Sequence, residues 1–170
     1  MRGKEGLSEN MENYLEVILR LQKRRKVARS KDIAKRLGVL PGSVSGALKT
    51  LKDLGLVNYE PYSFVTLTPK GARIAQRIER RHAVLKDFLL NVLRIDPDTA
   101  EETACRLEHD VDELTVDRLV CFIDYIHACP RAGDRWLDSF IRFCETQEMD
   151  EDRCDLCVAG IQSKPPQEAG

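Results

Sequence analysis

Three side chains that bind transition metals lie within five residues of one another, because Cys105, Glu108 and His109 all belong to the stretch CRLEH. Positions i, i+3 and i+4 of an α-helix share one face, so a helix here would point all three the same way. Thiolate, carboxylate and imidazole together suit Fe²⁺, Mn²⁺, Co²⁺, Ni²⁺ or Zn²⁺, and do not suit Mg²⁺ or Ca²⁺. A solvated polar helix face with an incidental cysteine is the simpler alternative.

The charged residues divide the chain into two parts. Residues 1–86 hold 19 Lys and Arg against 8 Asp and Glu, a net of +11, and the remaining residues have a net of −12. This division predicts a polyanionic partner for the first part, and the acidic second part suits the binding of cations. The sequence has no apolar run of membrane-spanning length and no export signal, so we expect a soluble, cytoplasmic protein without membrane partners.

The elements that must position the metal-binding side chains begin with three helices. Apolar residues recur at helical spacing over 8–24, and Ser8 is a suitable N-cap. A short helix is predicted over 30–38, capped by Ser30, and a third follows with Pro41 in its first turn. The stretch LVNYEPYSFVTLTPKG then alternates as a β-hairpin does. This order of elements predicts a winged helix-turn-helix.

Helical patterns continue through the acidic part. A long helix is predicted over 69–93, a second carries CRLEH, and a third ends at Pro130. We therefore expect a mainly α protein with a DNA-binding domain over 1–70, a metal-binding and dimerisation domain over 71–130, and a helix with a Cys-rich, finally disordered tail over 131–170. Completion of a monomeric core is the alternative role for the second domain. The predicted dimer contacts are Val84, Leu85, Phe88, Leu89, Leu119 and Phe122.

With these pieces in order, the chain resembles the diphtheria toxin repressor family of iron- and manganese-dependent transcriptional regulators, which includes the DtxR, IdeR and MntR types. The resemblance runs from about Ser8 to Pro130 and is carried by MENYLEVILRL, SKDIAKRLGVLPGSVSGALKTLKDLGLV, LTPKGARIAQRIERRH and ACRLEHDVDELTVDRL. It implies a homodimer that represses genes of metal homeostasis by binding a double-stranded DNA operator when it is loaded with metal. No enzymatic activity and no small-molecule substrate are expected.

The resemblance also implies a set of metal ligands from three helices. The matching positions are Asn13, Glu16, His82, Cys105, Glu108 and His109. Asn13 departs from the family, which has methionine or aspartate there, and its uncharged amide should bind metal more weakly. Lys86 stands where the family usually has a glutamate, so Glu101, one turn before Cys105, is a candidate replacement in a second site. A thiolate ligand favours Fe²⁺ as the activating ion, with Mn²⁺ as the second choice.

Contacts with DNA are expected from the second and third helices. Helix-turn-helix dimers read half-sites about 34 Å apart, which predicts a palindromic operator. Base contacts are predicted from the start of the third helix, at Pro41, Gly42, Ser43, Ser45 and Gly46. Phosphate contacts, which set affinity and its salt dependence, are predicted at Arg29, Lys31, Lys35, Arg36, Lys49 and Lys52.

The cysteines near the end of the chain allow a second metal centre. In a reducing compartment they are expected as thiols or metal ligands, and CDLC provides a Cys-x-x-Cys pair. Four of them, Cys129, Cys144, Cys154 and Cys157, could hold Zn²⁺ or an Fe–S cluster, with free thiols as the alternative. About 40 residues follow Pro130, too few for the SH3-like domain that longer family members carry.

Three functional hypotheses remain open from the sequence. The first is the metal-activated repressor. The second is a winged-helix regulator that senses redox state through its tail cysteines, with the CRLEH helix merely structural. The third is a metal-dependent enzyme, which lacks a recognisable catalytic motif and has a ligand set better suited to a closed site than to one with an open position.

Overall fold

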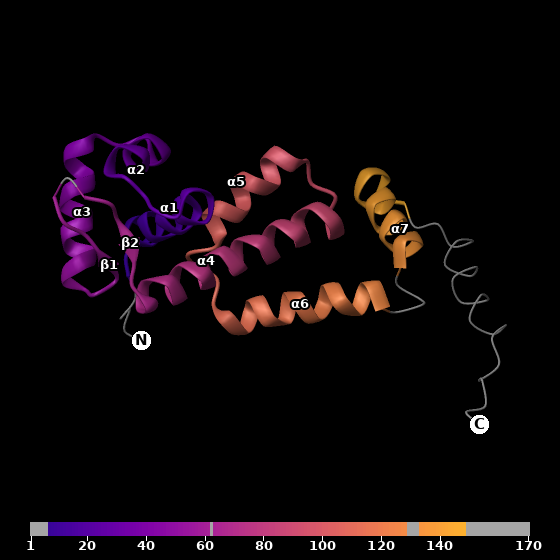
Figure 1. Ribbon diagram of the computed structural model, residues 1–170. Coiled ribbons are helices and arrows are strands. Elements are labelled where there is room, and N and C mark those ends of the chain that lie inside the picture. The colour runs from indigo at the N-terminus through magenta and orange to yellow at the C-terminus, as the bar shows by residue number, and fades with distance from the viewer. Residues whose placement is uncertain (1–6, 62, 129–132, 149–170) are drawn as a thin grey trace, which may run out of the picture. The chain divides into compact units, whose positions relative to one another are not determined.

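A computed structural model of the chain describes residues 7–61, 63–128 and 133–148 and shows a mainly α-helical protein with one small sheet (Figure 1). The described residues form two compact units. The first contains residues up to 83 together with 105–110, and the second contains 84–104 and the residues after 110. The expected fold class is confirmed.

Three helices and a hairpin build the first unit. Its helices are α1 (Glu9–Arg25), α2 (Ser30–Leu37) and α3 (Pro41–Asp53). Ser8 caps α1 as predicted, because its hydroxyl accepts the N–H of Met11 at 3.4 Å. Ser30 was wrongly predicted as the cap of α2: it is the first helical residue, and Arg29 occupies the N-cap without a side-chain bond. Fully buried Leu15, Ile18, Ile33, Leu48 and Leu51 join these helices in one core.

The predicted hairpin is present and short. Strands β1 (Val57–Asn58) and β2 (Thr66–Leu67) pair antiparallel, and a further bridge joins Ala28 to Val65. Gly71 lies so close to the Leu56 backbone that a Cβ there would collide with the Leu56 carbonyl oxygen. The absence of a side chain at Gly71 therefore allows the next helix to begin directly against the hairpin.

The long helix that follows is interrupted, in contrast to the predicted continuous α-helix over 69–93. It consists of α4 (Pro69–Asp87) and a π-helical turn, η1 (Phe88–Val92), in which Leu93 N–H bonds to Phe88 O at 3.0 Å. The wider turn leaves both Leu89 and Val92 buried, in two different hydrophobic clusters of the second unit. Packing of these side chains accounts for the departure from the regular helix.

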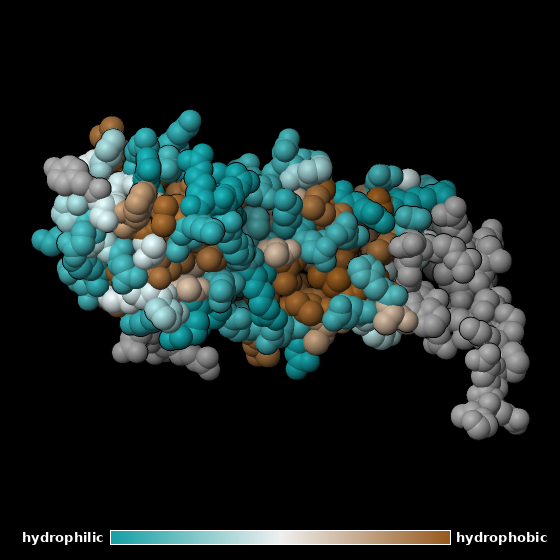
Figure 2. All heavy atoms as spheres, in the orientation of Figure 1, coloured by the Kyte–Doolittle hydropathy of each residue, from teal (hydrophilic) through white to brown (hydrophobic). Residues whose placement is uncertain are grey.

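Three further helices complete the described chain: α5 (Pro97–Leu107), α6 (Glu113–Ala128) and α7 (Gly133–Thr146). On the face of the second unit that is in view, Figure 2 shows hydrophobic atoms gathered over the end of α4 and over α6. Of the predicted dimer contacts, Leu85 and Leu89 are buried in the chain's own core, whereas Phe122 is exposed. No helix in the described part of the chain is long and apolar enough to span a membrane.

Candidate metal centre

The CRLEH stretch does not lie on one helix face, so this part of the prediction was wrong. Helix α5 ends at Leu107, and Glu108 and His109 belong to the turn that follows. The carbonyl oxygen of Glu108, which a continuing helix would use internally, instead accepts a hydrogen bond from the Arg81 guanidinium at 3.2 Å. A contact with α4 thus satisfies the carbonyl that a continuing helix would have bonded internally.

Three of the predicted ligands nevertheless converge in the first unit. The donor atoms of His82, Cys105 and Glu108 all lie within 4.8 Å of one another. His82 Nδ1 is 2.7 Å from Glu108 Oε2, and Cys105 Sγ is 3.8 Å from the same nitrogen. The Glu108 side chain is 1% exposed, so this carboxylate depends on partners within the protein.

His109 faces a different set of partners. Its Nδ1 lies 2.8 Å from Glu12 Oε2, and its Nε2 lies 3.0 Å from Asn13 Oδ1 and 3.4 Å from Glu108 Oε1. The two oxygens of Glu108 therefore face two different histidines. Sequence reasoning found Asn13 and missed Glu12, although Glu12 lies one helical turn before Glu16 and shares its face of α1.

Glu16 is buried and forms an ion pair with Arg20. Arg20 Nη2 donates to Glu16 Oε1 at 2.6 Å, one helical turn along α1. Burial raises the pKa of the Glu16 carboxyl, and the negative charge of Glu108 raises it further. Arg20, His82 and His109 act on that pKa in the opposite direction. Glu16 is thus electrostatically linked to the site but lies outside the three-residue donor cluster.

Glu101, the candidate replacement ligand of a second site, forms an ion pair with Lys86. Its carboxylate lies 2.7 Å from Lys86 Nζ, so the lysine that departs from the family pattern forms an ion pair with the proposed replacement ligand. The two side chains are 38% and 44% exposed, as is usual for a surface ion pair. An ammonium beside Glu101 disfavours the binding of a cation by this carboxylate.

The donor set fits a divalent transition metal. Nitrogen, sulfur and carboxylate oxygen lie together, mostly buried, and all three are ligands that such metals take. His82 and Glu108 at 2.7 Å, His109 and Asn13 at 3.0 Å, and Cys105 and His82 at 3.8 Å already face one another. The arrangement can therefore accept an ion with small side-chain movements.

The predicted DNA-contacting residues are all exposed: Arg29, Lys31, Lys35, Arg36, Pro41, Gly42, Ser43, Ser45, Gly46, Lys49 and Lys52. The Arg29 guanidinium lies 5.2 Å from the ring centroid of Phe64 in the hairpin, at cation–π distance. Among the tail cysteines, Cys129, Cys154 and Cys157 lie outside the described residues. Cys144 is exposed on α7, as a free thiol among the residues that the structure describes.

Comparison with known families identifies the fold and the two kinds of domain that the chain contains. Residues 6–65 match the family model of the N-terminal DNA-binding domain of iron-dependent repressors, and residues 68–137 match the model of their metal-binding and dimerisation domain. The chain belongs to the iron-dependent repressor family. Family members are transcriptional regulators and not enzymes, and DNA binding, divalent-metal binding and dimerisation are their shared properties.

The alignments with two curated relatives cover about two thirds of this chain and most of each relative. The uncharacterized HTH-type transcriptional regulator MJ0568 of Methanocaldococcus jannaschii is 38% identical over 119 residues, which are 69% of this chain and 95% of that protein. The transcriptional regulator MntR of Salmonella typhimurium is 38% identical over 114 residues, which are 67% of this chain and 72% of that one. These family matches give no support to the redox-sensing alternative.

Solved structures agree on the fold. The manganese regulator SloR has a TM-score of 0.61 at 34% identity over 75% of this chain, and IdeR of T. acidophilum has a TM-score of 0.61 at 26% identity over 76%. This chain spans 59% and 61% of those two chains, respectively.

Proposed function

We propose that this protein is a metal-dependent transcriptional repressor whose affinity for a palindromic operator is raised by a divalent ion bound in the first unit. The observation that carries this proposal is the convergence of His82, Cys105 and Glu108 within 4.8 Å, next to the helices of a winged helix-turn-helix. Glu108 is buried and ionisable, so a cation between these side chains would offset the cost of removing its charge from water.

The ligand set divides between the two histidines. His82 Nδ1, Cys105 Sγ and Glu108 Oε2 form one group of donors, and His109 Nε2, Asn13 Oδ1 and Glu108 Oε1 form the other. Glu12 lies on the opposite edge of the His109 ring, where it holds Nδ1–H and leaves the Nε2 lone pair for metal. Glu16 is a candidate ligand once Arg20 releases it.

Fe²⁺ is the activating ion that the donor set favours, and Mn²⁺ is the second candidate. The Cys105 thiolate is a soft ligand and prefers iron to manganese, whereas oxygen donors from carboxylates and the Asn13 amide suit manganese. SloR is described as a manganese regulator, and another similar solved structure is a manganese-dependent transcriptional repressor. Ligand type therefore favours iron, whereas the similarity to manganese regulators supports manganese as the alternative.

Metal binding would act on DNA binding by selecting one conformation. The ion, when bound, supplies positive charge that holds together side chains of α1, α4 and the turn after α5. Restricting these elements favours the arrangement in which two copies of α3 can reach both operator half-sites. A change from mostly inactive to mostly active requires about 5 kcal/mol of differential binding, which is within the range of a site with several ligands.

The repressor proposal is tested with apo-protein prepared without oxygen. DNA fragments that bind the Mn²⁺-loaded protein are selected from random-sequence duplexes, and their affinities are then measured with no metal, Fe²⁺ or Mn²⁺. We expect tighter binding with either ion and selected sequences with two-fold symmetry. Binding that ignores both ions but changes with an added thiol oxidant would overturn the proposal in favour of the redox sensor.

A further inference from the structure

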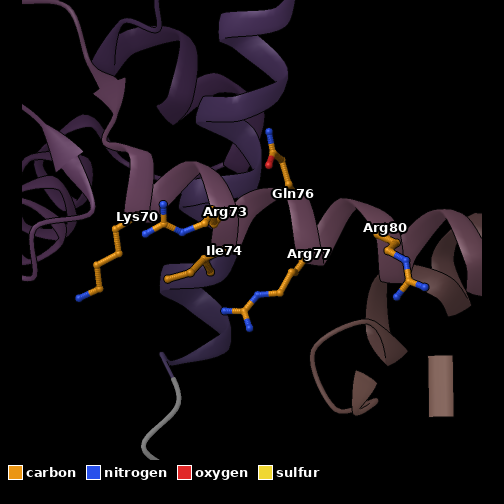
Figure 3. Close-up of a pocket in the computed structure, with 6 residues that line it drawn as sticks. All are labelled: Lys70, Arg73, Ile74, Gln76, Arg77 and Arg80. Atoms are coloured by element: carbon orange, nitrogen blue, oxygen red, sulfur yellow. The ribbon is translucent and has the colours of Figure 1, made fainter. Parts of the chain in front are cut away.

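The first half of α4 carries a cationic face, which we define as Lys70, Arg73, Arg77 and Arg80. These residues are three, four and three positions apart, so they line one side of the helix. Together with Ile74 and Gln76 they border a cavity of about 570 Å³, and Figure 3 shows their side chains extending from the helix. All four cationic residues are exposed. This face belongs to the first unit, as do α3 and the hairpin.

Two of the four charges of this face, those of Arg73 and Arg77, are uncompensated among the described residues. Within the described part of the chain, neither Arg73 nor Arg77 makes an ion pair. Lys70 Nζ lies 3.4 Å from a neutral acceptor, the carbonyl oxygen of Leu54. Among the residues that the structure describes, the cavity lining contains no carboxylate, since its two uncharged members are Ile74 and Gln76. Like charges one turn apart on a helix repel, so an external anion bound here would relieve that repulsion.

The spacing of the charges matches a nucleic-acid backbone. Ten residues of α-helix separate Lys70 from Arg80, which corresponds to about 15 Å. The phosphates of one DNA strand rise by ~3.4 Å each along the duplex axis, so a helix of this length can lie against more than one of them. Arginine also binds phosphate oxygens in a bidentate manner. A protein partner fits less well, because the cores of protein interfaces are depleted of charge and Ile74 is the single apolar residue among the described ones that border this cavity.

The cationic face begins where the DNA-reading helix ends. Leu54, whose carbonyl lies near Lys70 Nζ, is the C-cap of α3, and Gly71 packs against the backbone of Leu56. We propose that the cationic face of α4 binds phosphates of the DNA that α3 reads. This inference rests on the proposed function. It assigns a DNA contact to a helix outside residues 6–65, which the family model describes as the DNA-binding domain.

The test measures the salt dependence of DNA binding by the full chain with saturating Mn²⁺. The probe is a 40-base-pair duplex of arbitrary sequence, because phosphate contacts do not depend on base sequence. The double variant Arg73→Gln, Arg77→Gln removes two cations from exposed positions. If each contacts one phosphate, the slope of log K against log salt should become shallower by about 1.8, and binding at 0.1 M salt should weaken about 60-fold.

A matched control separates the contact from the change in net charge. The double variant Arg94→Gln, Arg118→Gln also removes two exposed arginines, but both belong to the second unit. It should keep the slope of the parent protein. Equal slopes for parent and α4 variant, or equal loss in the two double variants, would overturn the inference and leave the repressor proposal standing. If the parent protein binds neither this duplex nor any selected fragment, both proposals fail.

Discussion

His109 is held between two neighbouring side chains of α1 that lie almost a hundred residues earlier in the sequence. Glu12 Oε2 is 2.8 Å from Nδ1, and Asn13 Oδ1 is 3.0 Å from Nε2. A carboxylate at Nδ1 stabilises the tautomer that carries its proton there, so Nε2 is the nitrogen free to bind metal. We therefore infer that Glu12 positions His109, a role that was not expected from the sequence.

Replacing Glu12 should weaken metal binding without unfolding the protein. Glu12→Gln keeps an oxygen that can accept Nδ1–H but removes the charge, and Glu12→Ala removes both. Loss of such a supporting hydrogen bond typically costs about 10- to 100-fold in metal affinity, with the larger effect for alanine. Competition of Mn²⁺ or Co²⁺ with a metal-binding dye measures this affinity. Glu9→Gln, an exposed change in the first turn of the same helix, is the control. Identical affinities for all four proteins would exclude the positioning role.

Removal of the donors themselves should abolish the response to metal. Glu108→Ala takes away the carboxylate that faces both histidines, and His109→Ala removes one of its partners. We expect DNA affinity at saturating Mn²⁺ to equal that of the metal-free parent, with an unchanged far-UV circular dichroism spectrum. Because Glu108 is fully buried, Glu108→Gln is included as a variant of the same shape. A parent-like response in His109→Ala or Glu108→Gln would show that the metal site is elsewhere.

The helices of the first unit were predictable because their signals are local. Apolar residues at helical spacing, Ser8 before the first helix and Pro41 in the third act within one or two turns. The end of α5 at Leu107 has no such local signal, and the carbonyl of the next residue is bonded by Arg81, which is distant in sequence. The π-helical turn at Phe88 likewise depends on packing between distant helices.

The same distinction applies to the candidate site. Residue types and family resemblance were enough to find His82, Cys105 and Glu108, which the structure brings together. They could not rank Glu12 against Glu16, because the two carboxylates are four residues apart on one face of α1. The direction in which His109 leaves the turn decides this choice: Glu12 contacts the ring, and Glu16 pairs with Arg20.

The N-terminus of α6 should make stability depend on pH through Asp112. The backbone N–H and the hydroxyl of Thr115 both donate to this carboxylate at 3.0 Å and lower its pKa below the usual 3.8. A lowered pKa means that the stabilisation is present above pH 3.8 and is lost as the pH falls through the folded-state value. Asp112→Asn should therefore melt at a lower temperature than the parent at pH 6, and the difference should shrink toward pH 2.

Thermal denaturation followed by circular dichroism across this pH range checks the Asp112 prediction. Asp124→Asn provides the control, because Asp124 is an exposed carboxylate within the same helix. Its difference from the parent should vary less with pH. A melting-temperature gap between parent and Asp112→Asn that stays constant from pH 6 to pH 2 would contradict the role of the Asp112 charge.

A charged residue at position 13 should strengthen the response to metal. The Asn13 amide oxygen faces His109 Nε2 without a formal charge, and Asn13→Asp would supply one at the same place. Unit charges about 4 Å apart interact by about 4 kcal/mol at an effective dielectric constant of 20, so part of this gain suffices for at least about tenfold tighter binding of a divalent ion. Without metal the new carboxylate repels Glu12 and Glu108, so the apo-variant should melt at a lower temperature than the apo-parent.

An ion that binds only the folded state stabilises it according to its affinity. The rise in melting temperature on addition of Mn²⁺ combines tighter metal binding with the lower melting temperature of the apo-variant. This rise should therefore be larger in Asn13→Asp than in the parent. Asn10→Asp adds the same charge at an exposed position of the first turn of α1 and should behave like the parent. If the two variants show the same metal-induced rise, the effect is one of net charge, and the Asn13 side chain is not a ligand.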